Sequence, residues 1–449
     1  MRISRTPIDH IAPGRPLTFA GVADGAEGLV IADLARALAA RRDAPAVPLA
    51  VVCRDGPRLA ALSRALGFFA PDLVVAEFPA WDCLPYDRVS PHSTSVAQRM
   101  TALSRLAHAA EGRRHPTILL TTVNAAVQRV PSRQFVRHQS LSVAPGNVLA
   151  MESITAWLEL NGFARASTVR EPGDYAVRGG IIDLYAPGTA EPVRLDYFGD
   201  TLESIRTFDP ETQRTTGQLH SLDLVPVAEF QLSPDAIKRF RLGYIEAFGA
   251  PAPDDLLYHA VSEGRRHPGM EHWLPLFHEQ LETLFDYVPG SCIALEPLAE
   301  DAARERLGQV QDYYEARQQG LAQRGSGPPY KPLPPDRLYL REEESYERIA
   351  QVLLVRLTPF SVPQSQETVI DVGAKQGRNF AAERAEPGRN VFEAVAEHVA
   401  ALQGSGKRVT VALWSEGARE RMSHVLGDHG LPDLSPVASW HEAMRLAGS

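Results

Sequence analysis

Short apolar runs alternate with helix-like segments along the first 138 residues of the chain. The runs have strand length, and in the segments between them apolar residues recur at helical spacing. The predicted strands are residues 16–22, 48–54, 73–78 and 118–123, and the predicted helices are residues 29–41, 57–66 and 95–110. Because alternating strands and helices form right-handed crossovers, we expect an α/β domain with a parallel sheet.

The first strand-to-helix turn, residues 21–28, is where a P-loop NTPase would hold the phosphates of its nucleotide. The working pattern is GxxxxGK[ST], in which amides and the lysine grip the phosphates and the hydroxyl binds magnesium. With Gly21 as the first glycine, Glu27 stands at the lysine position and Gly28 at the hydroxyl position, and a frame one residue earlier puts alanine at the lysine position. We therefore predict a degenerate, non-functional nucleotide loop and no catalytic residue; the loop residues are Gly21, Asp24, Gly25, Glu27 and Gly28.

A second glycine-rich stretch, GSGK at residues 404–407, has the reverse context. It follows a predicted helix at 391–402 and precedes a predicted strand at 408–413, whereas a phosphate loop follows a strand and precedes a helix. We interpret it as a helix end capped by glycine.

Residues 170–215 contain three runs rich in β-branched and aromatic residues, at 176–185, 193–198 and 201–208. Glycine, proline or aspartate bounds each run, so antiparallel hairpins are expected. The side-chain period of two divides the second run into an apolar and a polar face. The apolar face holds Val193, Leu195 and Tyr197, and the polar face holds Arg194, Asp196 and Phe198.

The polar face of this run places an aromatic ring beside a guanidinium, a combination enriched in protein–protein hot spots. Alternatively, Phe198 is buried at the hairpin end and Arg194 only solvates the sheet. The alternation of side chains along the strand and the composition leave both interpretations open.

Charge indicates the class of partner. Residues 170–215 contain five arginines, no lysine and nine acidic residues, and the whole chain of 449 residues has a formal net charge of −9. A nucleic-acid surface usually needs excess lysine and arginine to release counterions from phosphates. The β-rich stretch is therefore predicted to bind a protein rather than DNA.

Length and segment boundaries predict about three domains. A helix at 151–161 leads into the β-rich stretch, and residues 224–230 are expected to re-enter the first sheet, which makes the β-rich unit an insertion. The α/β domain is predicted in two parts, at 1–138 and 227–322, around an inserted β-rich domain at 139–226. A Pro/Gly linker at 323–337 then leads to a small α/β domain of unclear role at 338–449. In this last domain, strands are predicted at 368–372 and 408–413 and helices at 391–402 and 416–426.

Cysteine usage and hydropathy indicate the compartment. Cys53, Cys83 and Cys292 are far apart and form no CxxC pair, which favours a reducing cytoplasm and neither disulfides nor a zinc site. The chain has no N-terminal apolar segment and no apolar run of membrane length, so a soluble cytoplasmic protein without a membrane partner is expected.

Other polar and aromatic candidates carry little weight. Trp81 and Tyr86 are expected to pack on the edge of the sheet rather than stack on bases, because no basic cluster surrounds them. The remaining candidates are Asp82, Asp87 and His92, whose spacing fixes no metal geometry, and His272 and His278, which are expected to be structural or exposed. No metal site is predicted.

Several motifs, in order, resemble the bacterial transcription-repair coupling factor family. The matching residues are FPAWD at 78–82, LPYD at 84–87, SPH at 90–92, Arg99, TVN at 122–124, QRV at 128–130, GDYAVRGGIIDL at 173–184, PVRLDYF at 192–198 and FDPETQRT at 208–215. The resemblance implies an α/β body similar to the repair helicase subunit UvrB, split around an inserted UvrA-binding domain and followed by a third domain. Carried over by motif, the UvrA contacts fall on Arg178, Arg194 and Phe198. Tyr197 stands where the family often has phenylalanine.

Full-length family members continue into a domain that binds RNA polymerase and an ATP- and magnesium-dependent motor on double-stranded DNA. Neither is in this sequence, so we expect an N-terminal fragment, a truncated form or a natural relic that needs no cofactor. In full-length members a C-terminal domain is thought to mask the UvrA-binding sheet. Without it the sheet should stay open, and the isolated C-terminal domain should compete with UvrA.

Two functions are weighed: an adaptor that recruits UvrA without catalysis, or an ATP-dependent helicase or translocase domain that binds DNA directly. Residues 124–150 contain a single large aromatic, so an aromatic hairpin for gripping damaged DNA, as in UvrB, is not expected.

Overall fold

The computed structural model describes residues 12–40, 48–108, 117–322, 330–363, 368–413, 415–431 and 434–446. Its largest unit is a seven-stranded parallel sheet in the order β17-β1-β16-β15-β2-β4-β3. The strands are β1 (Leu17–Ala20), β2 (Leu49–Cys53), β3 (Val75–Phe78), β4 (Ile118–Thr122), β15 (Cys292–Leu295), β16 (Leu353–Leu357) and β17 (Thr368–Asp371). The predicted α/β fold with a parallel sheet is confirmed.

Helices cover both faces of this sheet. One face packs against α2 (Glu27–Ala39) and α3 (Gly56–Phe69), and the other against α4 (Ser93–Ala107), α5 (Val123–Ala126), α10 (Leu284–Tyr287) and the start of α11 (Ala299–Ala322). Because both faces are covered, the central strands β2 and β4 are buried at every position. This is why their sequences are continuous apolar runs.

The sheet takes two strands from residues that we assigned to a separate domain. β16 pairs with β1 and β15, and β17 pairs with β1. The predicted boundary at 338 is therefore wrong, because a local pattern identifies a strand but not the sheet that it joins. The helix α12 (Glu342–Ala350) leads into β16.

The predicted linker is also wrong where it is described. Residues 323–329 lie outside the described part of the chain, but Tyr330 and Leu333 are buried and η3 (Pro335–Arg337) follows them. The centroids of the Tyr330 and Trp273 rings lie 4.8 Å apart. The prolines here order a packed segment rather than a spacer.

Beyond β17, the described residues contain helices and no strand. The helices are α13 (Ala381–Ala385), α14 (Val391–Gly404), α15 (Glu416–Asp428) and α16 (Trp440–Arg445). The helices predicted at 391–402 and 416–426 are confirmed, and GSGK is a helix end, where Gly406 has a φ of 77°. The strand predicted at 408–413 is wrong, since these residues form no strand.

A third cluster, rich in aromatic residues, packs beside the large sheet. It joins α8 (Pro234–Phe248), α9 (Leu256–Ser262) and η2 (Met270–Leu276) to the loop that carries Trp81 and Tyr86. The short strands β5 (Val130–Pro131) and β14 (Leu281–Glu282) pair next to it. Both loop aromatics are packed and buried, but within this cluster rather than on the edge of the large sheet, where we expected them.

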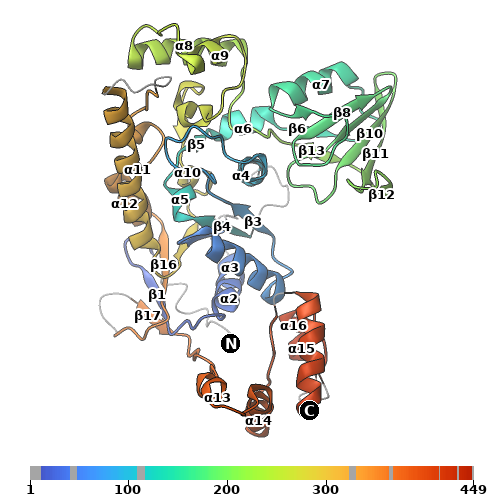
Figure 1. Cartoon of the computed structure of the whole chain (residues 1–449), viewed down its shortest axis with the longest axis vertical. Coiled ribbons are helices and arrows are strands. Elements are labelled where there is room, and N and C mark those ends of the chain that lie inside the picture. Colours follow the sequence, from blue (N-terminus) through green and yellow to red (C-terminus); the bar gives the residue numbers. More distant parts are fainter. Residues whose placement is uncertain are drawn as a thin grey trace.

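A separate six-stranded sheet projects to one side of the body (Figure 1), in the order β12-β11-β10-β9-β8-β7. Its strands are β7 (Ala164–Arg165), β8 (Asp174–Arg178), β9 (Ile181–Leu184), β10 (Val193–Phe198), β11 (Thr201–Phe208) and β12 (Thr215–Leu219). All neighbours are antiparallel except β7 and β8. The strands predicted at 193–198 and 201–208 are confirmed, whereas the run at 176–185 is a hairpin of two strands that turns at Gly179-Gly180.

Short elements connect this sheet to the body. The chain enters through α6 (Arg133–Gln139) and β6 (Leu141–Val143), and α7 (Met151–Leu160) then packs on the sheet. It leaves through β13 (Leu222–Leu224), which pairs with β6. Residues 225–230 form no strand, so the prediction that 224–230 re-enters the large sheet is wrong.

Candidate protein-binding surface

Strand β10 separates its side chains as the period of two predicts. Val193, Leu195 and Tyr197 are buried in a core shared with α7. Tyr197 makes no hydrogen bond through its hydroxyl to any described residue, and burial raises its pKa to about 12. A phenylalanine would fill the same space, so the tyrosine is compatible with the fold.

On the opposite face, Arg194 is held in a fixed orientation. Its Nε and Nη2 donate to the two carboxylate oxygens of Asp183 on β9, at 2.7 and 3.0 Å. The guanidinium also lies over the Phe208 ring, 4.9 Å from its centroid. The hydrogen bonds to Asp183 hold the pKa of Arg194 above its ordinary value. Arg194 is therefore a rigid, partly exposed group rather than a freely solvated one.

A second arginine–carboxylate pair lies next to the first. Arg206 on β11 donates to both oxygens of Asp196, at 2.8 and 2.6 Å, and Ser204 donates to the same carboxylate. Burial opposes ionisation of Asp196, but the hydrogen bonds from Arg206 and Ser204 outweigh it and lower the pKa. The middle of this face thus pairs its own charges.

Phe198 lies at the end of β10 and points outward. The residue is 77% exposed, so the interpretation that it is buried at the hairpin end is wrong. Gly199 and Asp200 make the two-residue turn, and Gly199 has a φ of 58°, which suits the type II′ turns of such hairpins. A short rigid turn therefore presents a large exposed ring.

Arg178 belongs to the same face at the next hairpin. It pairs across β8 and β9 with Ile181, which in turn pairs with Asp196 on β10. Opposed residues of an antiparallel pair share a face, so Arg178, Arg194 and Phe198 lie on one side of the sheet. Arg178 is exposed, donates to the Ser167 carbonyl at 2.5 Å and has no carboxylate partner among the described residues.

Sequence reasoning missed the carboxylates beneath these arginines. Asp183 is buried and lies directly opposite Arg194 in the β9–β10 register. The signal was present in the spacing, because a hairpin closed near residues 185–192 aligns positions 183 and 194. The boundary between β8 and β9 was needed to read that register.

The predicted nucleotide loop lies between β1 and α2, and β1 is the neighbour of the edge strand β17. Glu27, the first residue of α2, accepts a hydrogen bond from the Gly25 amide at 2.7 Å and one from Arg58 at 2.9 Å. Arg58 also pairs with Glu296, from the end of β15. The Glu27 carboxylate thus accepts hydrogen bonds from the Gly25 amide and the Arg58 guanidinium, the groups that a bound anion would use at this helix N-terminus.

The remaining candidates have structural roles. Asp82 accepts from the His92 amide at 2.8 Å, and His92 caps α4 through the Thr94 amide. His272 and His278 are buried. The described residues hold no cluster of three potential metal ligands, and no helix among them is both long and apolar enough to cross a membrane.

Comparison with known proteins shows to which proteins the chain is related. Residues 141–230, which include the whole projecting sheet, match the model of the UvrB interaction domain. The transcription-repair-coupling factor of Haemophilus influenzae is 35% identical over 300 residues, which are 67% of this chain and 25% of the relative. This chain is related to the N-terminal region of the transcription-repair-coupling factors.

Other members of the family match in the same way. The Escherichia coli factor is 28% identical over 89% of this chain and 33% of its own length, and that of Myxococcus xanthus is 33% identical over 67% of this chain and 26% of its own length. The chain therefore spans about a quarter to a third of these coupling factors.

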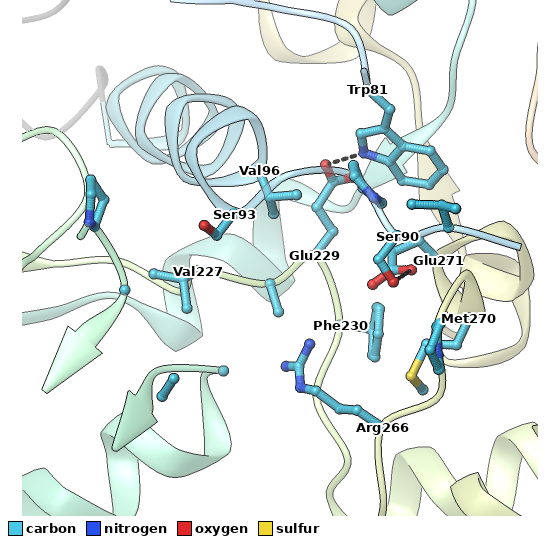
Figure 2. A pocket seen from close by; sticks show the side chains of 18 of the residues that line it. Trp81, Ser90, Ser93, Val96, Val227, Glu229, Phe230, Arg266, Met270 and Glu271 are labelled. Carbon is cyan, nitrogen blue, oxygen red and sulfur yellow. Dashed lines mark hydrogen bonds between the residues drawn. The ribbon is translucent and has the colours of Figure 1, made fainter. Parts of the chain in front are cut away.

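The family match ends where the projecting domain is anchored to the body. Glu229 accepts hydrogen bonds from Trp81, at 2.9 Å, and from Arg99 of α4, and both charged side chains are fully buried. A cleft of about 680 Å³ lies between the two units, and Trp81, Glu229 and Arg266 are among the residues that line it. Figure 2 shows the Trp81–Glu229 hydrogen bond beside this cleft and Arg266 pointing into it. The buried ion pair fixes the exit of the domain, since separating it would leave a charge unpaired.

Proposed function

We propose that this chain is an adaptor module that recruits the nucleotide-excision-repair damage sensor UvrA to stalled RNA polymerase in transcription-coupled repair. The observation that carries the proposal is the outward face of the projecting sheet, where Phe198, a residue 77% exposed, lies on the same side as the ordered Arg194. This face lies within the residues that match the UvrB interaction domain.

Arg178, Arg194 and Phe198 are proposed as the central UvrA contacts. The exposed ring offers apolar area that only a partner can bury, and the exposed Arg178 offers a cation to a carboxylate of UvrA. Arg194 and Arg206 already pair with carboxylates of the same sheet. That self-pairing disfavours a phosphate backbone as the ligand, because it leaves little excess positive charge.

The adaptor is proposed to work without hydrolysing ATP and without a cofactor. The body combines a parallel sheet with a strand–loop–helix where a P-loop would lie, and in that loop the Glu27 carboxylate is bound by Gly25 and Arg58. A phosphate placed there would face this carboxylate, and Glu27 itself stands at the lysine position of the pattern. ATP turnover by the chain would contradict this part of the proposal and favour the helicase alternative.

Contacts with RNA polymerase and double-stranded DNA are proposed for the parts of the coupling factors that this chain does not span. The open face of the sheet is consistent with a C-terminal domain that masks it in full-length relatives. In that case the isolated domain would compete with UvrA for this chain.

The test is a titration of UvrA with the whole chain and with Arg178→Glu. Arg178 is exposed and has no ion-pair partner among the described residues, so its reversal should leave the fold intact and weaken binding about tenfold or more. The matched control is Arg105→Glu, an exposed arginine on α4 of the body. Equal affinity of both variants for UvrA would place the contact elsewhere, and no binding by the parent chain would reject the adaptor function.

A further inference from the structure

The two most exposed large apolar side chains of the described residues are Val148, at 79%, and Phe198, at 77%. Val148 comes from the segment between β6 and α7, far from Phe198 in sequence. Isolated exposed apolar residues are ordinary, whereas exposed apolar residues gathered on one face are typical of an interaction site. The question is therefore whether the two lie on the same face.

The backbone pairing shows that they do. Val148 forms an antiparallel bridge with Thr201, through hydrogen bonds from Leu149 N to Asp200 O, at 2.8 Å, and from Leu202 N to Asn147 O, at 3.0 Å. Thr201 in turn opposes Phe198 across the β10–β11 turn. Because directly opposed residues project to the same side, Phe198, Thr201 and Val148 form one row across the hairpin end.

The row is held rigidly. Residues 144–147 form a turn closed by the Asn147 side chain, which accepts from the Ala144 amide at 2.8 Å, and the Gly146 amide donates to Leu202 O at 2.7 Å. Leu149, the next residue, packs against the core of the projecting domain. With Leu149 pointing inward and the bridge fixed, Val148 has to point outward, so no rearrangement is needed to present it.

We propose that Val148 is a further UvrA-contact residue, which extends the binding face from the arginines to an apolar end made by Val148 and Phe198. This inference rests on the proposed adaptor function and is continuous with its surface. It gives the partner a stated chemistry: UvrA presents an apolar depression opposite the hairpin end and an acidic group opposite Arg178. A binding site of this kind combines an apolar anchor with a polar rim.

The experiment is a titration of UvrA with the whole chain carrying Val148→Asp. The variant should bind about tenfold more weakly or worse, because a carboxylate cannot enter an apolar depression. Val148→Ile should bind like the parent, and Val148→Ser serves in place of the aspartate variant if that chain does not fold. The matched control is Leu242→Asp on α8, an apolar residue that is 63% exposed in the body.

The outcomes separate this inference from the function on which it rests. Loss of affinity with Val148→Asp and not with Leu242→Asp supports the extended face. Parent-like affinity with Val148→Asp, together with weak binding by Phe198→Ala, overturns the role of Val148 and leaves the adaptor function standing. Absence of binding by the parent overturns both.

Discussion

At the scale of single residues, the polar face of the projecting sheet is ordered by charges that pair within it. Arg194 and Asp183 form a nearly buried pair, with side chains 18% and 2% exposed, and Arg206 and Asp196 form a more open one, at 38% and 20%. The sequence could predict which side chains share this face, since parity alone decides it. It could not predict which arginine would form an ion pair with a carboxylate of the sheet, because that depends on the register between strands.

The buried pair should therefore matter more for stability than the open one. Arg194→Ala leaves Asp183 charged and without its partner, and should lower the free energy of unfolding by about 2 kcal/mol. Arg206→Ala, the control, should cost about 0.5–1 kcal/mol. Denaturant titrations of both variants give the comparison.

A double-mutant cycle isolates the interaction. Arg194→Ala combined with Asp183→Asn should lose less free energy of unfolding than the sum of the single changes, because the unpaired buried charge is gone. Strict additivity would show that the two side chains do not stabilise one another. It would also remove the argument that Arg194 is preorganised for a partner.

At the scale of elements, the sequence predicted strands and helices well where the local pattern is sufficient. The α/β alternation before residue 138 and the hairpin of β10 and β11 follow from apolar periodicity and from a Gly-Asp turn. The hairpin of β8 and β9 was missed because residues 176–185 look like one strand, in which only Gly179-Gly180 marks the turn. Gly180 approaches the β10 backbone so closely that a Cβ atom would lie 3.0 Å from the Tyr197 carbonyl oxygen, a tertiary contact that no local pattern reveals.

The aromatic cluster around η2 predicts a pH dependence. His272 and His278 are buried there, and burial lowers the pKa of each from 6.5 to about 4. Between pH 4 and pH 6.5 the two histidines bind protons in the unfolded chain but not in the folded chain. Their contribution to the free energy of unfolding is therefore fully present above about pH 6.5 and is lost as the pH falls. The slope should approach about 1.4 kcal/mol per pH unit for each histidine.

Denaturant unfolding at pH 7 and pH 5 measures this effect. The free energy of unfolding should decrease by about 2–4 kcal/mol between these values. The variant His272→Gln with His278→Gln cannot titrate in this range and should show a nearly flat dependence. An unchanged slope in that variant would assign the pH dependence to other groups.

At the scale of the whole molecule, the chain builds its body from distant segments. Strands β1, β15, β16 and β17 come from residues 17–20, 292–295, 353–357 and 368–371, and the projecting domain is inserted between β4 and β15. Figure 1 shows the consequence, a body from which the β-rich unit stands out to one side. Parallel pairing between remote strands is the part of the fold that sequence periodicity could not supply, and the misplaced boundary at 338 follows from it.

The proposal that the polar face of the projecting sheet binds UvrA is tested most directly by one comparison of affinities for UvrA. Phe198→Ala and Phe360→Ala remove the rings of residues that are 77% and 74% exposed, the first in the projecting sheet and the second in the body. If this face binds UvrA, Phe198→Ala weakens binding about thirtyfold, the equivalent of about 2 kcal/mol, and Phe360→Ala binds like the parent. Equal affinities of the two variants for UvrA would contradict the proposed contact surface.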